Sequence, residues 1–174
     1  MNLEIHKEPP ALSEQSLRVP RSALRELARI IGRAEKRGSR EAVSLIVTGD
    51  KKLRRLNREF RGIDRVTDVL SFTYPPHIGS TVIGEVYLSA RRARMQASDL
   101  GHSLGAEIIR LTCHGLLHIL GYDHQDETQA RRMREREDRY LKVLTDRRRG
   151  TDRRRGTDRR RGTDRQRSAA CLKG

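Results

Sequence analysis

The sequence predicts an α+β fold, in which helices pack against a small mixed β-sheet. Two features of the pattern support this class. Four short segments of strand character lie before residue 90, whereas three helical segments follow one another after it. One of these late helices is apolar on nearly every side, which is typical of a helix buried at the centre of a domain.

The first half of the chain is expected to alternate between strands and helices. Continuous or alternating apolar side chains predict strands over residues 2–6, 42–47, 69–72 and 82–88. Apolar residues at helical spacing after Pro20 predict an amphipathic helix over 20–37. A shorter helix carries Leu53 and Leu56, and Asp50 can cap its first turn.

The second half is expected to be helical. Helices are predicted over 89–100, 103–120 and 127–144, with Gly101 as the stop signal between the first two. The middle helix is the one that is apolar nearly all round, so we expect it to be central and buried. The resulting order of elements is βαβαββααα.

The chain after residue 145 has a different composition. Residues 146–167 contain no apolar side chain, and the hexad Arg-Arg-Arg-Gly-Thr-Asp occurs three times between Arg147 and Asp164. Because such a segment has nothing to bury, we expect a folded domain over 1–145 and a disordered Arg-rich tail over 146–174. Two interpretations of the tail stay open: a basic arm that binds RNA, and a repeat expansion tolerated at a chain end.

The charge of the chain is strongly positive. The formal net charge is +15, and the residues from Thr145 onward include 12 Lys and Arg against 4 Asp. The rest of the chain keeps 26 basic side chains against 19 acidic ones, so the folded domain is basic as well. Such a surface favours a polyanionic partner such as nucleic acid. The alternative is a basic surface without such a partner.

The sequence has no marks of secretion or membrane insertion. Its first residues lack a basic segment followed by an apolar run, and no apolar run approaches the ~20 residues of a membrane span. Cys113 and Cys171 are far apart and in unlike contexts, which does not indicate a disulfide framework. We therefore expect a cytoplasmic protein with no membrane partner.

The segment that carries chemistry lies at the end of the buried helix. His114 and His118 are four residues apart and therefore share one helix face. Gly121 lies where the helix should end, because glycine readily adopts the left-handed conformation that turns the chain back. His124 can then join the other two. Burying three imidazoles without a partner is costly, so we expect them to bind one metal ion.

Three histidine ligands predict a catalytic rather than a structural metal site, because a fourth tetrahedral position stays open. Neutral imidazole suits zinc, although nickel, copper and iron(II) accept the same ligands. The spacing H-x-x-x-H-x-x-G-x-x-H equals that of the metzincin proteases, but Gly115 stands where those enzymes carry their catalytic glutamate. The pattern favours a metal-dependent hydrolase.

Two further groups of polar residues have open interpretations. Glu107 lies seven residues before His114 on the same helix face, where it either orients a histidine or only complements the helix N-terminus; we favour the second. A hydrolase of phosphodiesters also needs a cation, and arginine has the best geometry for phosphate. Spacing alone does not choose among the candidates Arg54, Arg55, Arg58 and Arg61.

Several motifs together resemble the YbeY family of bacterial endoribonucleases. The first is the histidine segment from His114 to His124. A second stretch comprises Leu56-Asn57, Phe60-Arg61, Asp64 and residues 67–72. A third is residues 84–89, in which relatives often have Asp in place of Glu85, and a fourth is the closing helix over 133–144. The resemblance spans residues 43–144 and leaves the Arg-rich tail outside.

The resemblance implies a zincin-like α+β fold in which His114, His118 and His124 bind zinc, one ion per chain. It implies that Arg61 is the functionally important arginine, and that Arg61, His114 and His118 act in catalysis. The implied activity is cleavage of single-stranded RNA in ribosomal RNA maturation and ribosome quality control. The implied partners are RNA and the ribosome or its small subunit.

Two other functions stay open at this point. A metallopeptidase or amidohydrolase could use the same metal scaffold, but the missing glutamate and the basic charge count against it. A non-catalytic RNA-binding or ribosome-assembly factor could hold a structural metal. The aromatic content of 3 % disfavours a base-stacking surface, and the open coordination position favours catalysis.

Overall fold

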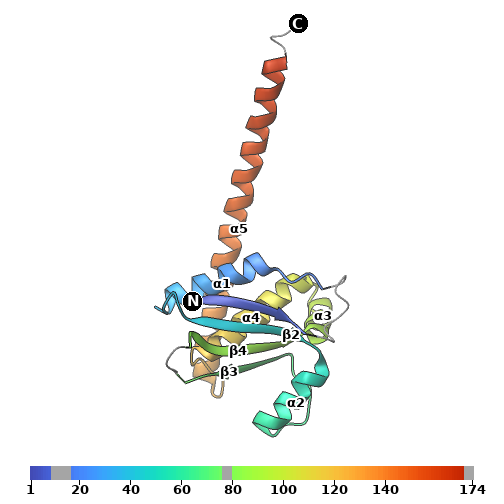
Figure 1. Cartoon of the computed structure of the whole chain (residues 1–174), viewed down its shortest axis with the longest axis vertical. Helices are drawn as coiled ribbons and strands as arrows, with labels where there is room; N and C mark the ends of the chain where they lie inside the picture. The colour runs from blue at the N-terminus through green and yellow to red at the C-terminus, as the bar shows by residue number, and fades with distance from the viewer. Residues whose placement is uncertain (9–16, 76–79, 171–174) are drawn as a thin grey trace.

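A four-stranded sheet with the strand order β1-β2-β4-β3 lies at the centre of the computed structural model (Figure 1). The structure describes residues 1–8, 17–75 and 80–170, with the backbone alone for residues 152–170. Three strands run parallel, namely β1 (Asn2–Lys7), β2 (Ala42–Thr48) and β4 (Val82–Ser89). β3 (Val69–Thr73) pairs antiparallel with β4, so the predicted mixed sheet is confirmed.

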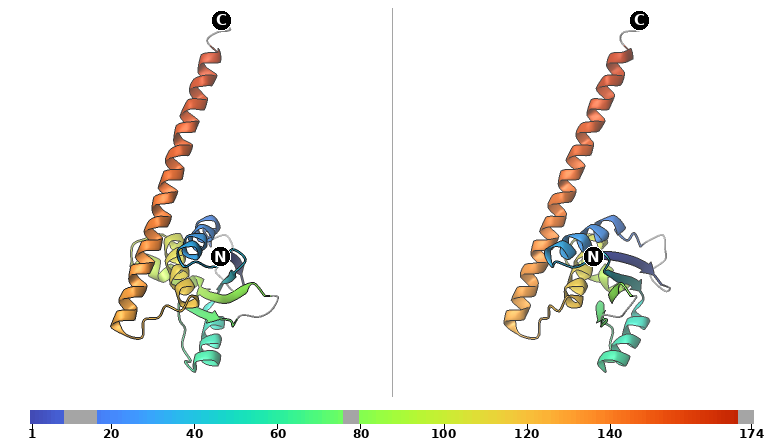
Figure 2. Two further views of the ribbon diagram at one scale, coloured as in Figure 1. Left: turned by 90° about the vertical axis from the view of Figure 1, so that its left-hand side faces the viewer. Right: turned by 60° about the vertical axis from the view of Figure 1, so that its left-hand side comes forward.

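The described helices follow the predicted order. They are α1 (Arg21–Ala34), α2 (Asp50–Arg61), α3 (Ala90–Asp99), α4 (Leu104–Ile119) and α5 (Glu127–Ala170). Figure 2 shows α1, α4 and α5 together on one side of the sheet. None of the helices in the described part of the chain is long and apolar enough to cross a membrane. The α+β class and the order βαβαββααα are therefore confirmed.

The core forms where the sequence patterns predicted it. Every residue of β2 is buried, as is usual for a strand with parallel neighbours and both faces covered. The apolar stripe of α1 is also buried, at Leu24, Leu27, Ala28 and Ile31. α4 buries residues around most of its circumference, which confirms that it is the central helix.

Two neighbouring residues of β4 reveal which helix covers each face of the sheet, because successive strand residues point to opposite faces. Val86 lies under α4, since a Cβ added at Gly115 would come within 2.6 Å of Val86 Cγ1. Tyr87 points the other way and packs beside the buried leucines of α2. α4 and α2 therefore cover opposite faces of the β3–β4 half of the sheet.

The first helix ends earlier than predicted. α1 ends at Ala34 rather than at residue 37, and Lys36 takes a left-handed conformation with φ +53°. The backbone N–H of Arg37 donates to the carbonyl of Gly32, which closes this turn. The sequence predicted that the helix stops before Gly38, because glycine adopts the left-handed conformation most easily. In the structure Lys36 adopts this conformation instead.

The last helix extends beyond its predicted end. α5 continues to Ala170, so the predicted end at residue 144 is wrong, and Figure 1 shows α5 projecting from the rest of the molecule. Among residues 127–151 of α5, whose side chains the structure describes, the buried apolar side chains are Met133, Tyr140 and Leu144. Helical hydrogen bonds are local and arginine is a good helix former, so the hexads can continue a helix without apolar partners. The division into a domain over 1–145 and a tail over 146–174 stays a prediction.

We expect Gly115→Ala to destabilise the protein by about 1–3 kcal/mol, the usual cost of overpacking. The added Cβ would lie 2.6 Å from Val86 Cγ1 and 3.1 Å from Ser71 Oγ. The matched control is Gly105→Ala in the same helix, where the nearest atoms are 3.9 Å away. Alanine there should be neutral or stabilise by up to about 1 kcal/mol. Urea denaturation measures both variants, and equal stabilities would contradict the close packing of α4 on the sheet.

Candidate metal centre

The C-terminal end of α4 brings two histidines to one face, and the following turn brings the third. Ser103 caps the helix by accepting a hydrogen bond from the Ala106 N–H, and the helix ends at Ile119. Gly121 takes φ +89°, and its N–H donates to the carbonyl of His118 over 3.0 Å. The predicted glycine turn is confirmed, and it returns the chain towards the helix.

The imidazoles of His114, His118 and His124 meet at this turn. One ring nitrogen from each lies within 4.8 Å of those from the other two. His114 Nε2 and His118 Nε2 are 3.1 Å apart. Nitrogen ligands of a tetrahedral zinc ion lie about 3.3 Å from each other, so the two inner histidines already have a suitable separation. His114 and His118 are partly buried and His124 is exposed, which leaves the site open to solvent on one side.

A carboxylate on α5 orients the first of these ligands. Glu137 Oε1 lies 2.6 Å from His114 Nδ1, and both side chains are largely shielded from solvent. Because an ionised carboxylate can only accept, Nδ1 carries the proton and Nε2 keeps the free lone pair. This arrangement is the usual outer partner of a metal-binding histidine, which fixes both its tautomer and its ring orientation.

The second ligand is held in its neutral form. Burial, followed by repulsion from His114 and His124, lowers the pKa of His118, and this outweighs the opposite effect of Asp123. Asp123 Oδ1 is 4.0 Å from His118 Nδ1. A neutral imidazole has the lone pair that a metal ion needs, so His118 is ready to bind at neutral pH.

The turn that carries His124 is anchored to two other helices. Tyr122 OH donates to the Glu35 carboxylate at the end of α1, with both oxygens 3.1 Å away. Tyr140 OH, from α5, donates to the same carboxylate. Arg136 Nη1 lies 3.8 Å from Glu35 Oε1 and balances its charge. Glu35 therefore ties α1, α5 and the segment two residues before His124 together.

Glu107 does not contact the three histidines. It is fully buried in the first turn of α4, where its carboxylate lies 2.7 Å from His102 Nε2 and 2.5 Å from Arg110 Nη2. Of the two interpretations of Glu107, the contacts support an acid at the helix N-terminus and not a partner of His114. The partner is Glu137, which the sequence interpretation missed.

The four candidate arginines lie on α2 and differ in their contacts. Arg54 makes two hydrogen bonds of 2.8 Å to Asp64, and Arg55 lies 3.9 Å from Glu59. Arg61 is exposed at the last position of α2, and no ion pair joins it to a described carboxylate. α2, which carries Arg61, and α4, which carries His114 and His118, cover opposite faces of the sheet.

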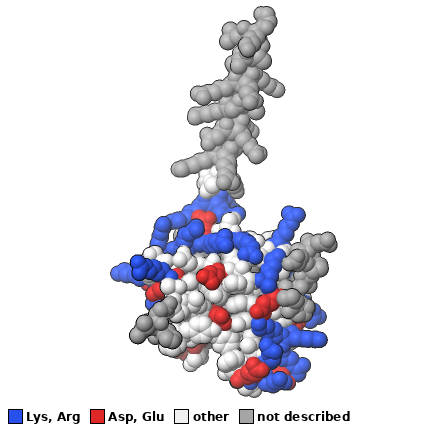
Figure 3. All heavy atoms as spheres, viewed as in Figure 1, with Lys and Arg blue, Asp and Glu red and all other residues white. Residues whose placement is uncertain are grey.

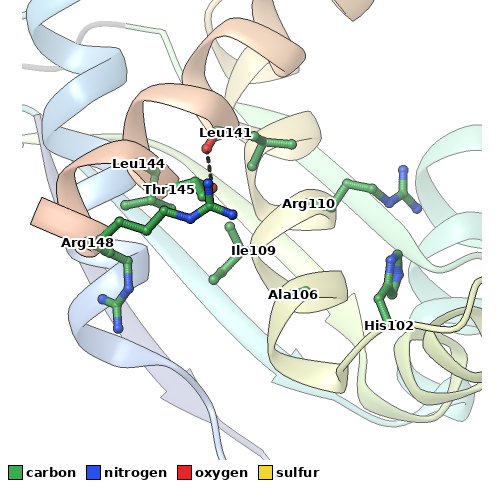
Figure 4. A pocket seen from close by; sticks show the side chains of 9 residues that line it. His102, Ala106, Ile109, Arg110, Leu141, Leu144, Thr145 and Arg148 are labelled. Carbon is green, nitrogen blue, oxygen red and sulfur yellow. Dashed lines mark hydrogen bonds between the residues drawn. The ribbon is translucent and has the colours of Figure 1, made fainter. Parts of the chain in front are cut away.

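A separate cavity lies between α4 and the middle of α5. It has a volume of about 430 Å³, and Figure 4 shows Ile109, Leu141 and Leu144 along it with Arg110 and Arg148 beside them. None of the three histidines lines this cavity. The chemistry of the candidate site therefore belongs to the solvent-facing turn at the end of α4 and not to this apolar space.

The fold and the geometry define a class of protein: an α+β domain with a possible mononuclear site of three histidines, of the kind found in metal-dependent hydrolases. Residues 11–145 match the family model described as Endoribonuclease YbeY. The chain therefore belongs to the YbeY endoribonuclease family, as its motifs predicted.

Individual relatives agree with this assignment. Endoribonuclease YbeY of Heliobacterium modesticaldum is 43 % identical over 112 residues, which cover 58 % of this chain and 68 % of the relative. Endoribonuclease YbeY of Shouchella clausii is 32 % identical over 153 residues, which cover 81 % of this chain and 93 % of the relative. The solution structure of TM1509 from Thermotoga maritima has the same fold, with a TM-score of 0.52 and 24 % identity over 86 % of this chain and 93 % of that one.

We expect Glu137→Gln to weaken metal binding about 10–100-fold, because the amide is a weaker acceptor and orients His114 less firmly. The fold should persist, since the substitution keeps the size of the side chain. The matched control is Glu135→Gln, an exposed carboxylate two residues earlier in α5. Competition with a chromophoric chelator measures both affinities. Unchanged affinity in Glu137→Gln would contradict the orienting role of Glu137.

Proposed function

We propose that this protein is a metal-dependent endoribonuclease that cleaves single-stranded RNA. The observation that carries the proposal is the convergence of His114, His118 and His124 within 4.8 Å in a protein of the YbeY family. The positive net charge of +15 supports a polyanionic substrate. The relatives that the chain matches are named as endoribonucleases.

Zinc is the metal we propose, with one ion per chain. Three neutral imidazoles are a common zinc ligand set, and they leave one position for substrate or water. When bound, the ion would supply a Lewis acid that polarises the phosphodiester and activates the attacking hydroxyl. Glu137 would keep His114 in the tautomer that binds, and burial would keep His118 neutral.

Arg61 is proposed to hold a phosphate of the RNA. Its guanidinium is exposed and has no described carboxylate partner, whereas Arg54 is held by Asp64. A free planar guanidinium can donate two parallel hydrogen bonds to a phosphate and stabilise negative charge that develops during cleavage. Because α2 and α4 cover opposite faces of the sheet, RNA that reaches both Arg61 and the histidines would cross the edge of the sheet.

The packing of α4 argues against a peptidase. A metzincin carries its catalytic glutamate at the position of Gly115. Here that position faces the sheet, with Val86 Cγ1 only 2.6 Å from where a Cβ would lie. No carboxylate fits there, so the motif supplies no general base for peptide hydrolysis. Phosphodiester cleavage, in which the arginine and the ligand set carry most of the charge stabilisation, matches these residues better.

The biological substrate we propose is ribosomal RNA, in its maturation and in ribosome quality control, with the ribosome or its small subunit as the partner. The family membership and the basic charge of the folded domain support this assignment. A ribosome offers single-stranded RNA segments within a large polyanion, which a basic enzyme approaches readily.

We expect Arg61→Ala to lower RNA cleavage about 10–1000-fold, the usual range for loss of one charge-stabilising group. Metal content and melting temperature should stay near those of the unmodified protein, because the side chain is exposed. Arg61→Lys should rescue activity only in part, since lysine lacks the planar fork. The control is Arg55→Ala on the same helix. Cleavage of a labelled single-stranded RNA measures the rates.

His118→Ala and a chelator test the metal requirement in the same assay. Both should abolish cleavage, and zinc should restore it only to the chelated unmodified protein. Unchanged cleavage in His118→Ala would contradict the proposed metal-dependent activity. Unchanged cleavage in Arg61→Ala would contradict the proposed role of Arg61.

We propose that residues 146–174 form a basic tail that is separate from the catalytic domain. Deletion of Arg147 to Gly174 should preserve metal content and the rate at saturating RNA, because Met133, Tyr140 and Leu144, which pack α5 into the core, precede it. Affinity for RNA at low salt should fall, and the slope of log affinity against log salt should become shallower. Binding titrations at several salt concentrations measure this. An identical slope would exclude an RNA-binding role of the tail.

A further inference from the structure

The aromatic side chains of this protein are few but not scattered. The chain has two Phe, four Tyr and no Trp. Tyr122 and Tyr140 bind Glu35 beside the metal centre. The other four lie close to one another in the fold. Phe60 belongs to α2, Phe72 to β3 and Tyr87 to β4, and Tyr74 directly follows β3. The main core under α1 and α4 is built almost entirely from aliphatic side chains.

Three of these four rings form a continuous row. Phe60 meets Phe72 edge to face, with 5.0 Å between ring centroids, and Phe72 meets Tyr87 in the same way at 5.8 Å. Phe72 and Tyr87 point to the sheet face that α2 covers, as the buried cluster around Leu70 indicates. The row therefore runs from α2 across β3 to β4. We call Phe60, Phe72, Tyr74 and Tyr87 the aromatic face.

The aromatic face is partly open to solvent. Phe60 is 66 % exposed and Tyr74 is 40 % exposed. Complete burial of a phenylalanine side chain is worth about 1.5–3 kcal/mol, so an exposed ring at the end of a helix contributes little of this to folding. A merely structural ring would be expected at a position that buries it. Most of the Phe60 ring is therefore open to a ligand from solvent.

One carboxylate holds a tyrosine of the aromatic face in place. Glu85 Oε2 accepts a hydrogen bond from Tyr87 OH over 2.8 Å. Burial and the Glu85 carboxylate raise the pKa of Tyr74 to about 12, so its phenol stays protonated at neutral pH. A ring held as Tyr87 is held is pre-organised, and a flat ligand that stacks on it would lose little further freedom.

The helix beside the aromatic face is rich in basic side chains. The sequence of α2 contains six Lys and Arg residues and two acidic ones. Lys52 Nζ lies 5.3 Å from the ring centroid of Tyr87, and Arg61 directly follows Phe60. Figure 3, which has the view of Figure 1, shows basic side chains together with some acidic ones where α2 lies, beside a surface over the strands that carries few charges. This combination is complementary to a chain that alternates flat bases and negative phosphates.

We propose that the aromatic face is a stacking surface for the bases of single-stranded RNA. The proposal rests on the proposed endoribonuclease function and names where the substrate binds beyond the metal centre. One base stacks on Phe60 while Arg61 holds an adjacent phosphate, and further bases lie along Phe72 and Tyr74. Stacking needs unpaired bases, which explains a preference for single strands without hydrogen bonds to particular bases. The low aromatic content of the sequence disfavoured a base-stacking surface. The structure brings four of the six aromatic residues together, so a small number is sufficient to form one.

The test compares two short oligomers with the same number of phosphates: a 2′-O-methyl oligouridylate, which resists attack by its own 2′ oxygen, and an abasic oligomer. Fluorescence anisotropy measures their binding to zinc-loaded full-length protein. Phe60→Ala should weaken binding of the base-bearing oligomer about 5–100-fold and leave the abasic oligomer unaffected. Phe60→Trp should retain the affinity of the unmodified protein. The matched control is Met95→Ala. Met95 is an exposed apolar residue like Phe60 but lies on α3, so its replacement should change neither affinity.

Several results would overturn the proposal. Equal binding of the base-bearing oligomer by Phe60→Ala and the unmodified protein would exclude stacking on Phe60 while leaving the nuclease intact. Equal losses for both oligomers in Phe60→Ala, with an unchanged melting temperature, would show that the loss does not come from base stacking. If the unmodified protein neither binds nor cleaves RNA, the proposed function itself fails, and this inference fails with it.

Discussion

The close approach of α4 to the sheet is the constraint on which the rest of the structure depends. Gly115 and Gly84 allow it, since a Cβ on either would lie about 2.5–2.6 Å from atoms of the facing element. At this distance Ser71 Oγ donates to the Gly115 carbonyl over 3.1 Å, which ties β3 directly to the helix. The approach fixes how α4 is rotated, and with it the direction in which His114 and His118 point.

That rotation explains how one helix can be both a core element and a ligand carrier. Most of its circumference is aliphatic and buried, so the helix is anchored by the hydrophobic effect over its whole length. The polar groups around the three histidines lie where His114 of α4 meets Glu137 of α5 and at the turn that Gly121 forms. There Glu137 and Glu35, one from α5 and one from the end of α1, satisfy His114 and Tyr122. The metal centre is thus supported by the same three helices that enclose the core.

The sequence predicted most of the fold and the meeting of the three histidines, because both depend on local patterns. The strand segments, the apolar helix and the glycine turn after His118 can each be recognised from neighbouring residues. Glu137 was missed because its contact with His114 joins residues 23 positions apart. A signal was available: Glu137 lies on the stripe of Met133, Tyr140 and Leu144, where an acid would be buried without a partner. Two helix ends were predicted wrongly. The end of α5 was predicted from the loss of apolar residues, and the end of α1 from the position of a glycine, whereas local backbone hydrogen bonds determine both ends in the structure.

Binding of a single ion by the three histidines is the central claim, and titration of the metal-free protein with cobalt(II) tests it most directly. Cobalt(II) is a spectroscopic substitute for zinc, and its visible absorption is strong in a four-coordinate site. We expect the absorption to saturate at one ion per chain, and zinc to displace the cobalt. The variant His114→Ala should lose the signal. Absence of a saturable signal, or the same signal in His114→Ala, would contradict the metal centre.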